Sequence, residues 1–254
     1  MGEIPVGVQL YTLREETKKD FKGTLQKVAA LGYQGVEFAG YEGHTAQEIR
    51  AWLTDLQLKP ASSHVPLEQL ESNLEQVIHF EQQVGNSHIV CPYLMPERQT
   101  EKGYHVLIDS LNDIDTYCKK EGMSFSYHHH DFELKKLSTG KSALQTILEE
   151  TEVNVELDIY WLTKAGEDPV EWMKHYQNRM PFIHLKDMTT DGEQFFAPLG
   201  TGGVDVKAVM QEGHRAGVKW WIVEQDHCIE SPLSSIKKSL SIKKRTDSVC
   251  SFFY

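Results

Sequence analysis

Three consecutive histidines stand at positions 128–130, inside the stretch SFSYHHHDFEL (residues 124–134). Imidazole nitrogens bind transition metals, and a neutral imidazole can also accept a proton. The run follows residues typical of a β-strand, along which side chains point alternately to opposite faces. We therefore expect His128 and His130 to share one face and His129 to point away. The simpler alternative is a histidine-rich polar loop, and the rest of the chain decides between the two.

Other ionisable residues close short apolar runs. Asp158 ends VNVELD, His184 ends PFIH and Glu224 ends WWIVE. Together with one nitrogen of the histidine run, these three side chains have the chemistry of a site for one divalent ion. A mixed nitrogen and oxygen set suits Mn²⁺, Zn²⁺, Co²⁺ or Fe²⁺ and disfavours Ca²⁺, which prefers oxygen ligands alone.

Additional polar residues lie at the ends of other apolar runs or directly after them. A single buried histidine or carboxylate is often a satisfied core group, but several on one axis must be paired or bound to a metal. Lys186, directly beyond a candidate ligand strand, is the most informative, because burial can lower the pKa of a lysine into a useful range. Its alternative is a structural ion pair with Asp187 or Glu224. The remaining candidates are Gln9, Glu37, His64 and Glu133.

The elements that must position these residues alternate regularly. Eight short apolar runs are each followed by a segment of helical period. That number of strand–helix units over about 250 residues is typical of a (β/α)₈ TIM barrel, in which chemistry sits at the carboxyl ends of the strands. A doubly wound sheet is the rival, but TLREETKKD, after the first run, lacks the glycine fingerprint. The expected strands begin near residues 6, 35, 60, 88, 123, 153, 181 and 219.

No linker or low-complexity break divides the chain, so we predict one domain over residues 1–254. Its ordered core is expected over about 4–240, followed by a C-terminal extension at 241–254. That extension carries a basic run and ends in Phe252, Phe253 and Tyr254, which are apolar for a free tail. The sequence does not say what they pack against.

Composition narrows the partners. The formal net charge is -11 and the sequence pI is about 5.5, which disfavours nucleic acid. The four cysteines form no C-x-x-C pair, and no signal peptide or membrane-length apolar run is visible. We expect a cytoplasmic protein that acts on a small sugar or polyol, with no nucleic-acid or membrane partner. A homo-oligomer remains open.

The chain resembles the sugar phosphate isomerase/epimerase family, within the xylose isomerase-like TIM barrel superfamily. The likeness runs over nearly the whole chain and is carried by VGVQLYTLR, GYQGVEFAG, YHHHDFEL, ELDIYWLTKAGEDP, FIHLKD, LGTGGVD and WWIVEQD. In this order the motifs are specific for the superfamily and much less specific for a reaction.

The resemblance implies one Mn²⁺-type ion held by residues of strands five to eight. By position the ligands are Asp158, His184 and Glu224. The fifth-strand ligand is a glutamate in the ketose epimerases, and His128 stands in its place here. Trp161 replaces a substrate-binding histidine of those enzymes and offers a stacking face. Zn, Co, Fe or Mg are the alternatives to Mn.

The implied chemistry is metal-assisted proton abstraction next to a carbonyl. Returning the proton gives a sugar isomerase or epimerase, which is our first expectation. Loss of a β-oxygen gives a dehydratase or lyase on a keto-sugar or inosose. A catalytically inactive barrel acting as a binding or partner subunit is the alternative of another class. The expected catalytic residues are Glu224, Lys186, His130 and Glu133, and those expected to bind substrate are Gln9, Glu37, His64 and Trp161.

The loop LGTGGVD could bind a phosphate through backbone N–H groups, as loops after late barrel strands often do. No cluster of Arg or Lys accompanies it. The sequence therefore favours a substrate without a phosphate.

Overall fold

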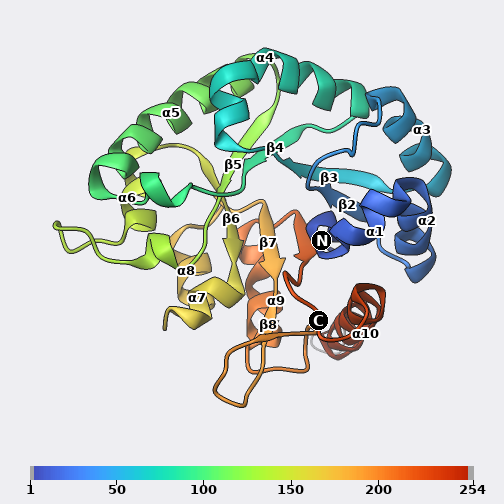
Figure 1. Cartoon of the computed structure of the whole chain (residues 1–254). Helices are drawn as coiled ribbons and strands as arrows, with labels where there is room; N and C mark the ends of the chain where they lie inside the picture. The colour runs from blue at the N-terminus through green and yellow to red at the C-terminus, as the bar shows by residue number, and fades with distance from the viewer. Residues whose placement is uncertain (1–2, 251–254) are drawn as a thin grey trace.

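Eight parallel strands close into a barrel in the computed structural model, which describes the backbone of residues 3–250 and side chains over residues 3–241. The predicted TIM barrel is confirmed, and consecutive barrel strands are neighbours all the way round (Figure 1). The strands are β1 (Val6–Gln9), β2 (Gly35–Phe38), β3 (Lys59–His64), β4 (His88–Cys91), β5 (Ser124–His128), β6 (Asn154–Asp158), β7 (Phe182–Leu185) and β10 (Trp220–Val223).

Helices surround the strands, as Figure 1 shows. Their apolar faces pack on the outward-facing strand residues, which is why segments of helical period alternate with the apolar runs. The helices are α1 (Arg14–Lys19), α2 (Phe21–Leu31), α3 (Ala46–Leu56), α4 (Leu67–Val84), α5 (Glu101–Lys120), α6 (Ala143–Glu150), α7 (Ile159–Lys164), α8 (Pro169–His175), α9 (Val206–Ala216) and α10 (Pro232–Cys250).

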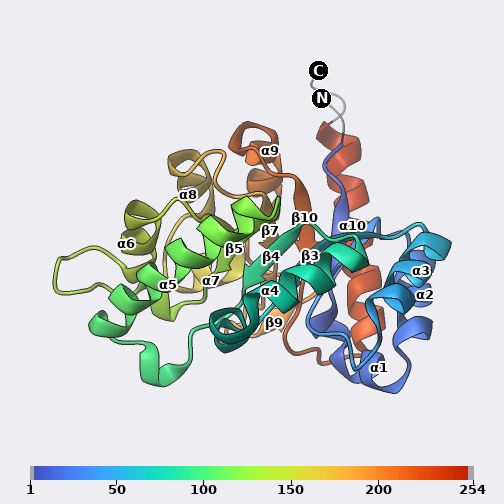
Figure 2. The ribbon, with the colours of Figure 1, turned by 90° about the horizontal axis from the view of Figure 1, so that it is seen from above.

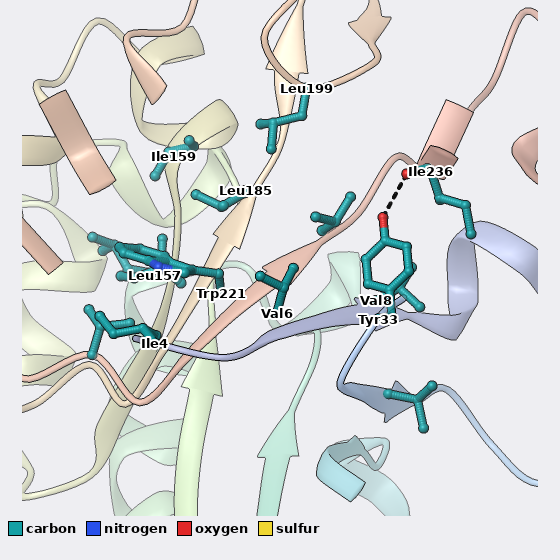
Figure 3. Packing of buried hydrophobic residues seen from close by; sticks show 14 of the residues in the cluster. Ile4, Val6, Val8, Tyr33, Leu157, Ile159, Leu185, Leu199, Trp221 and Ile236 are labelled. Atoms are coloured by element: carbon teal, nitrogen blue, oxygen red, sulfur yellow. Dashed lines mark hydrogen bonds between the residues drawn. The ribbon is translucent and has the colours of Figure 1, made fainter. Parts of the chain in front are cut away.

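The closing helix is fastened to the start of the barrel. Tyr33, just before β2, donates a hydrogen bond from its hydroxyl to the backbone oxygen of Ile236 at 2.8 Å (Figure 3). Figure 2 shows α10 upright beside the N-terminal strand. Burial of the Tyr33 side chain raises the pKa of its phenol well above the usual range, so it remains a donor. This contact joins the last helix to the segment that precedes β2.

Local sequence signals set most helix boundaries. Thr45 and Glu48 form a capping box at the start of α3. Asp168 caps α8 ahead of Pro169, and Asp205 caps α9. Because such caps act within one turn of chain, they could be recognised without tertiary information.

Two boundaries differ from the sequence-based expectation. The sixth run was expected to remain a strand as far as Trp161, but β6 stops at Asp158, whose Oδ1 accepts hydrogen bonds from the N–H groups of Tyr160 and Trp161. That side chain starts α7 and ends the strand. The loop after β7 also contains a short antiparallel pair, β8 (Asp187–Met188) with β9 (Phe196–Ala197).

The last helix, α10, reaches into the predicted C-terminal extension and ends at Cys250. Residues 251–254, which include Phe252, Phe253 and Tyr254, lie outside the described residues. Within the described part of the chain, no helix is both long enough and apolar enough to cross a membrane.

Candidate metal centre and active site

His184, the inward-facing residue near the end of β7, is the centre of the polar cluster inside the barrel. It is fully buried, and both its ring nitrogens face carboxylate oxygens. Nδ1 lies 2.9 Å from Glu224 Oε2 and 3.8 Å from Asp158 Oδ2. Nε2 lies 2.7 Å from Glu37 Oε1 and 3.0 Å from Glu156 Oε2. The imidazole therefore separates two groups of carboxylates.

The charge of this ring follows from its neighbours. Burial disfavours the imidazolium, but Glu156, Glu37 and Glu224 outweigh burial and raise the pKa of His184 well above its usual range. Without an ion, the ring thus carries both protons and donates to both sides. A metal ion would replace the proton on one nitrogen, because only a deprotonated nitrogen can ligate.

Two sets of side chains in the described residues bring donor atoms close enough to hold an ion. One set is Asp158, His184 and Glu224, and the other is His64, His128, Glu156 and His184. The structure thus brings together three of the four predicted ligands. It places His128 with the second set, where its Nδ1 lies 3.1 Å from Glu156 Oε2.

Glu156 was missed by the sequence analysis. It lies two residues before Asp158 in VNVELD, so both side chains point into the barrel. That alternation was the signal that could have identified it. A carboxylate in the middle of a strand would be unpaired inside the barrel. Its partners, His64 and His184, come from other strands and cannot be identified from the local sequence.

Orphaned donor atoms test whether this cluster fits a metal ion. Asp158 Oδ2, Glu156 Oε1 and His128 Nδ1 are all buried and make no hydrogen bond within the described residues, although Asp158 Oδ2 lies 3.1 Å from Lys186 Nζ and His128 Nδ1 lies 3.1 Å from Glu156 Oε2. Buried polar atoms are normally hydrogen-bonded, so ligand atoms without hydrogen bonds leave coordination capacity for an ion. Two carboxylates, an imidazole and a further imidazole nearby are a donor set suited to a divalent transition metal. The residues therefore fit the implied ion.

Lys186 lies among the carboxylates of the first set. Its Nζ is 2.6 Å from Glu224 Oε2, 2.8 Å from Asp226 Oδ1 and 3.1 Å from Asp158 Oδ2. Burial disfavours the ammonium, but these carboxylates outweigh burial and raise the pKa of Lys186 well above its usual range. The expectation that burial lowers this pKa is wrong, because three anions surround the group. Asp187, named as its possible partner, instead faces a loop.

His128 and His130 both line the cavity at this end of the barrel, and His129 does not, as the alternation predicted. His129 accepts a hydrogen bond at Nε2 from the backbone N–H of Asp158 at 3.1 Å, and burial lowers its pKa to about 4. Burial and nearby cations, Lys186 first, also lower the pKa of His130 well below its usual range. His130 is thus a neutral imidazole whose Nδ1 has no hydrogen-bond partner in the described chain.

Glu133 is placed behind the cavity wall. Its carboxylate accepts hydrogen bonds from the hydroxyl of Tyr127 at 2.6 Å and from the N–H of His130 at 2.9 Å. It is fully buried and is not among the cavity-lining residues. Burial raises its pKa to about 7. The structure supports a role in holding the backbone of His130.

The four predicted substrate-binding residues separate into two groups. His64 lines the cavity, whereas Gln9, Glu37 and Trp161 do not. Gln9 donates from Nε2 to Glu37 Oε1 at 2.7 Å, so both lie beneath His184 as part of its hydrogen-bond network. Trp161 supports the wall: its ring centroid is 5.2 Å from that of His130 and 5.6 Å from Lys186 Nζ.

His64 carries a charge in the ion-free protein. Its Nε2 lies 2.6 Å from Glu156 Oε2 and 3.2 Å from Glu37 Oε1. Burial opposes protonation, but Glu37 and Glu156 outweigh it and raise the pKa of His64 to about 10. The two deep carboxylates are therefore balanced by the imidazolium rings of His64 and His184.

The loop LGTGGVD is not arranged to bind phosphate. Asp187 Oδ2 accepts hydrogen bonds from the N–H groups of Gly200 and Gly202, at 2.8 Å and 2.9 Å. Asp187 Oδ1 accepts from Val204 at 3.0 Å. The N–H groups that could have held an anion therefore already hold a carboxylate of the same chain.

Comparisons with known proteins identify the family of this barrel. A family model described as a xylose isomerase-like TIM barrel matches residues 25–244. An inosose dehydratase from Clostridium perfringens is 27% identical over 167 residues, a match that covers 58% of this chain and 56% of that enzyme. The chain thus matches little more than half the length of such curated relatives. An inosose dehydratase from Clostridium botulinum is 23% identical, with 96% of each chain covered.

Solved structures agree on the fold. A sugar phosphate isomerase/epimerase from Parabacteroides distasonis superposes with a TM-score of 0.82 at 23% identity, covering 95% of this chain and 93% of that one. An L-ribulose 3-epimerase superposes with a TM-score of 0.72 at 13% identity, covering 96% and 94%. At these sequence identities, the structural similarity establishes the barrel fold and does not identify the reaction.

Proposed function

The chain belongs to the xylose isomerase-like TIM barrel family, and on that premise we propose that it is a divalent-metal-dependent enzyme that removes a proton next to a carbonyl of a sugar or a polyol-derived ketone. One observation carries the proposal. His184 faces Asp158 and Glu224 through one ring nitrogen and a second carboxylate pair through the other, at the end of a barrel cavity.

Asp158, His184 and Glu224 would hold the ion. His128, the fourth ligand implied by the resemblance, lies with Glu156 in the second donor set. Asp158 can offer only Oδ2, because Oδ1 caps α7. An ion bound there supplies a Lewis acid that polarises a substrate carbonyl and makes the adjacent C–H acidic. We propose Mn²⁺ first, with Zn, Co, Fe or Mg as alternatives.

His130 is the proposed base, and Lys186 is the proposed stabiliser of negative charge. His130 is neutral and unpartnered at Nδ1, so it can accept a proton at that atom. Lys186 is an ammonium held by Asp158, Glu224 and Asp226, and the raised pKa keeps its proton in place, so it can stabilise a developing oxyanion as a fixed positive charge.

Isomerisation or epimerisation remains the first assignment, with proton return as the second half of the reaction. Dehydration is the second candidate. His130 can remove the proton next to the carbonyl and, as the imidazolium, return it to a departing β-hydroxyl, so that water leaves. The inosose dehydratase relatives support the same alternative.

The location proposed for this reaction is cytoplasmic. Cys91 and Cys118 are buried free thiols, a condition that a reducing compartment preserves. Neither the ion nor the proposed substrate depends on that location.

Elemental analysis and solvent-deuterium exchange test the proposal together. We expect about one Mn, Co, Zn or Fe per chain, lost in His184→Ala, and deuterium uptake at the α carbon of a ketose or inosose. His130→Ala is expected to keep its ion and lose about 10²–10⁴-fold in exchange rate, as for removal of a general base. Uptake without loss of water identifies an isomerase or epimerase, and loss of water identifies a dehydratase.

Two results would contradict the proposal. A wild-type chain with no ion, even after soaking in Mn²⁺ and Zn²⁺, would leave an inactive barrel that acts as a binding subunit. Equal exchange in wild type and His130→Ala would remove that residue from the reaction. His79→Ala, an exposed histidine of α4, is the matched control and is expected to change neither measurement.

A further inference from the structure

The cavity does not end at the candidate metal centre. From His128, Lys186 and Glu224 it continues outward between α4 and the segment from Ala39 to His44, which joins β2 to α3. Figure 1 shows α3 and α4 next to each other at this side of the barrel. We propose that this outer arm binds a second, uncharged sugar unit, so that the substrate is a glycoside or disaccharide rather than a single sugar ring. The proposal rests on the proposed function, because the reacting unit is placed at the ion centre.

Size is the first argument. The cavity has a volume of about 1050 Å³. Pockets for drug-sized ligands have about 300–1000 Å³, and such ligands are considerably larger than one sugar ring. A single ring placed against Lys186 and Glu224 would leave the outer arm filled with water. A site shaped for one ring has no need of walls on α4.

The chemistry of the arm is the second argument. Gln69, Asn73 and Gln76 are exposed on one face of α4 and line the cavity. The side chains of Gln69 and Gln76 make no hydrogen bond within residues 3–241, so their amides are free to bind hydroxyl groups as donor and acceptor. Phe80 and Tyr41 also line the cavity, and their ring centroids are 4.7 Å apart. Amides and aromatic rings in one cavity suit the hydroxyl groups and the apolar face of a sugar.

A break in α4 opens this wall. Asn73 has φ -140° and ψ 31°, which is not helical, and it interrupts the helix between Leu67 and Val84. On the facing side, Gly40 and Gly43 have φ of +99° and +80°, with open space where a side chain would stand. These two glycines keep side chains out of their part of the arm, leaving room for a ligand.

Charge excludes a phosphate as the outer group. Lys186 is the one Lys or Arg among the described lining residues, and three carboxylates hold it. The lining of the arm includes a carboxylate, Glu81, which accepts hydrogen bonds from Tyr41, Ser63 and Asn86 at 2.7–2.8 Å. A phosphate needs donors or cations to replace its hydration. A neutral hydroxylated unit does not need such cations.

Calorimetric titration of the Mn²⁺-loaded wild type tests the assignment. The probes are maltose, cellobiose and sucrose, each compared with the monosaccharides from which it is built. We expect at least one disaccharide to bind at least about tenfold tighter than its monosaccharides, a gain typical of one or two additional hydrogen bonds. If no disaccharide binds more tightly, including if none binds at all, the proposal is overturned.

Variants assign the gain to the arm. Gln76→Trp fills the arm and is expected to abolish the difference between disaccharide and monosaccharide, and the double variant Gln69→Ala/Gln76→Ala is expected to reduce it about tenfold. Glu75→Trp is the matched control: it lies on the same helix, is exposed, and does not line the cavity. It is expected to retain the wild-type difference. Retention of that difference in Gln76→Trp would overturn the proposal.

Failure of this inference can be told apart from failure of the proposed function. An ion and α-carbon exchange without any preference for disaccharides would refute the outer subsite alone. A disaccharide preference in a chain with no ion and no exchange would refute the proposed reaction and keep the subsite as part of a carbohydrate-binding barrel.

Discussion

His184 and Glu156 meet inside the barrel, where Nε2 of the imidazole lies 3.0 Å from Oε2 of the carboxylate. Glu37 lies 2.7 Å from the same nitrogen, so a carboxylate pair faces Nε2 while Glu224 faces Nδ1. An acceptor at Nε2 keeps the proton there and leaves Nδ1 free for a ligand bond. Carboxylate partners of metal-binding histidines commonly act in this way.

Glu156→Gln is therefore expected to weaken ion binding by about 10–100-fold, the usual cost of losing such a partner. The dissociation constant for Mn²⁺, measured by competition with a chelating dye, checks this. Glu152→Gln, an exposed residue just before β6, is the control and should bind Mn²⁺ as the wild type does. An unchanged constant in Glu156→Gln would show that the orientation of His184 is set by Glu37 alone.

Lys186→Met is expected to make the protein depend on its ion for stability. Removing the ammonium leaves Asp158, Glu224 and Asp226 without their cation, and breaking a buried ion pair on one side costs about 3–5 kcal/mol. The metal-free variant should therefore melt earlier than the wild type. Added Mn²⁺ should raise its melting temperature more than it raises that of the wild type.

Differential scanning calorimetry with and without Mn²⁺ measures both effects. Lys174→Met, which removes an exposed lysine that pairs with Glu171, should change neither. Equal ion-induced shifts in Lys186→Met and wild type would mean that the ammonium and the ion do not share ligands.

The raised pKa of Glu133 predicts that the free energy of unfolding depends on pH. Burial raises its pKa from 4.5 to about 7, so the folded state holds its proton over a range in which the unfolded state has lost it. The resulting stabilisation is fully present below about pH 4.5 and is lost as pH rises through about 7. The shift corresponds to about 3 kcal/mol at most, at 1.36 kcal/mol per pKa unit.

Glu133→Gln lacks this titration. Its free energy of unfolding, from urea titrations at pH 5, 6, 7 and 8, should improve relative to the wild type as the pH rises. The amide cannot accept from both Tyr127 and His130, so a constant loss is expected at every pH. A difference between variant and wild type that stays the same from pH 5 to pH 8 would contradict the raised pKa.

Asp187→Asn should loosen the segment from Gly200 to Val204. The amide retains one acceptor for the four N–H groups that the carboxylate now binds, which include Met188. Hydrogen bonds to a charged group contribute about 1.5–3 kcal/mol. Amide hydrogen exchange should therefore accelerate at Gly200, Gly202 and Val204.

Asp191→Asn, in the exposed loop between β8 and β9, is the control for that measurement. It should leave exchange at the glycine segment unchanged. Unaltered exchange in Asp187→Asn would mean that the segment is held by its packing and not by the carboxylate.

The barrel and the positions of most candidate residues could be predicted from local patterns along the chain. Period-2 and period-3.6 patterns, and caps such as Thr45 and Asp168, act over a few residues, so they can be read along the chain. The same local alternation correctly separated His128 and His130 from His129. Asp158 was recognised as a candidate ligand, but the strand was expected to continue past it, and the helix that it starts was not expected.

The contacts and charge states of those residues depend on long-range packing. Closure of the barrel brings Glu37 from β2 against His184 from β7, a contact between residues 147 positions apart that no local pattern encodes. It also gives Lys186 three carboxylate neighbours and so reverses the expected direction of its pKa shift. Charge states and cavity shape depend on long-range packing, because electrostatic energies are set by distance and burial rather than by order along the chain.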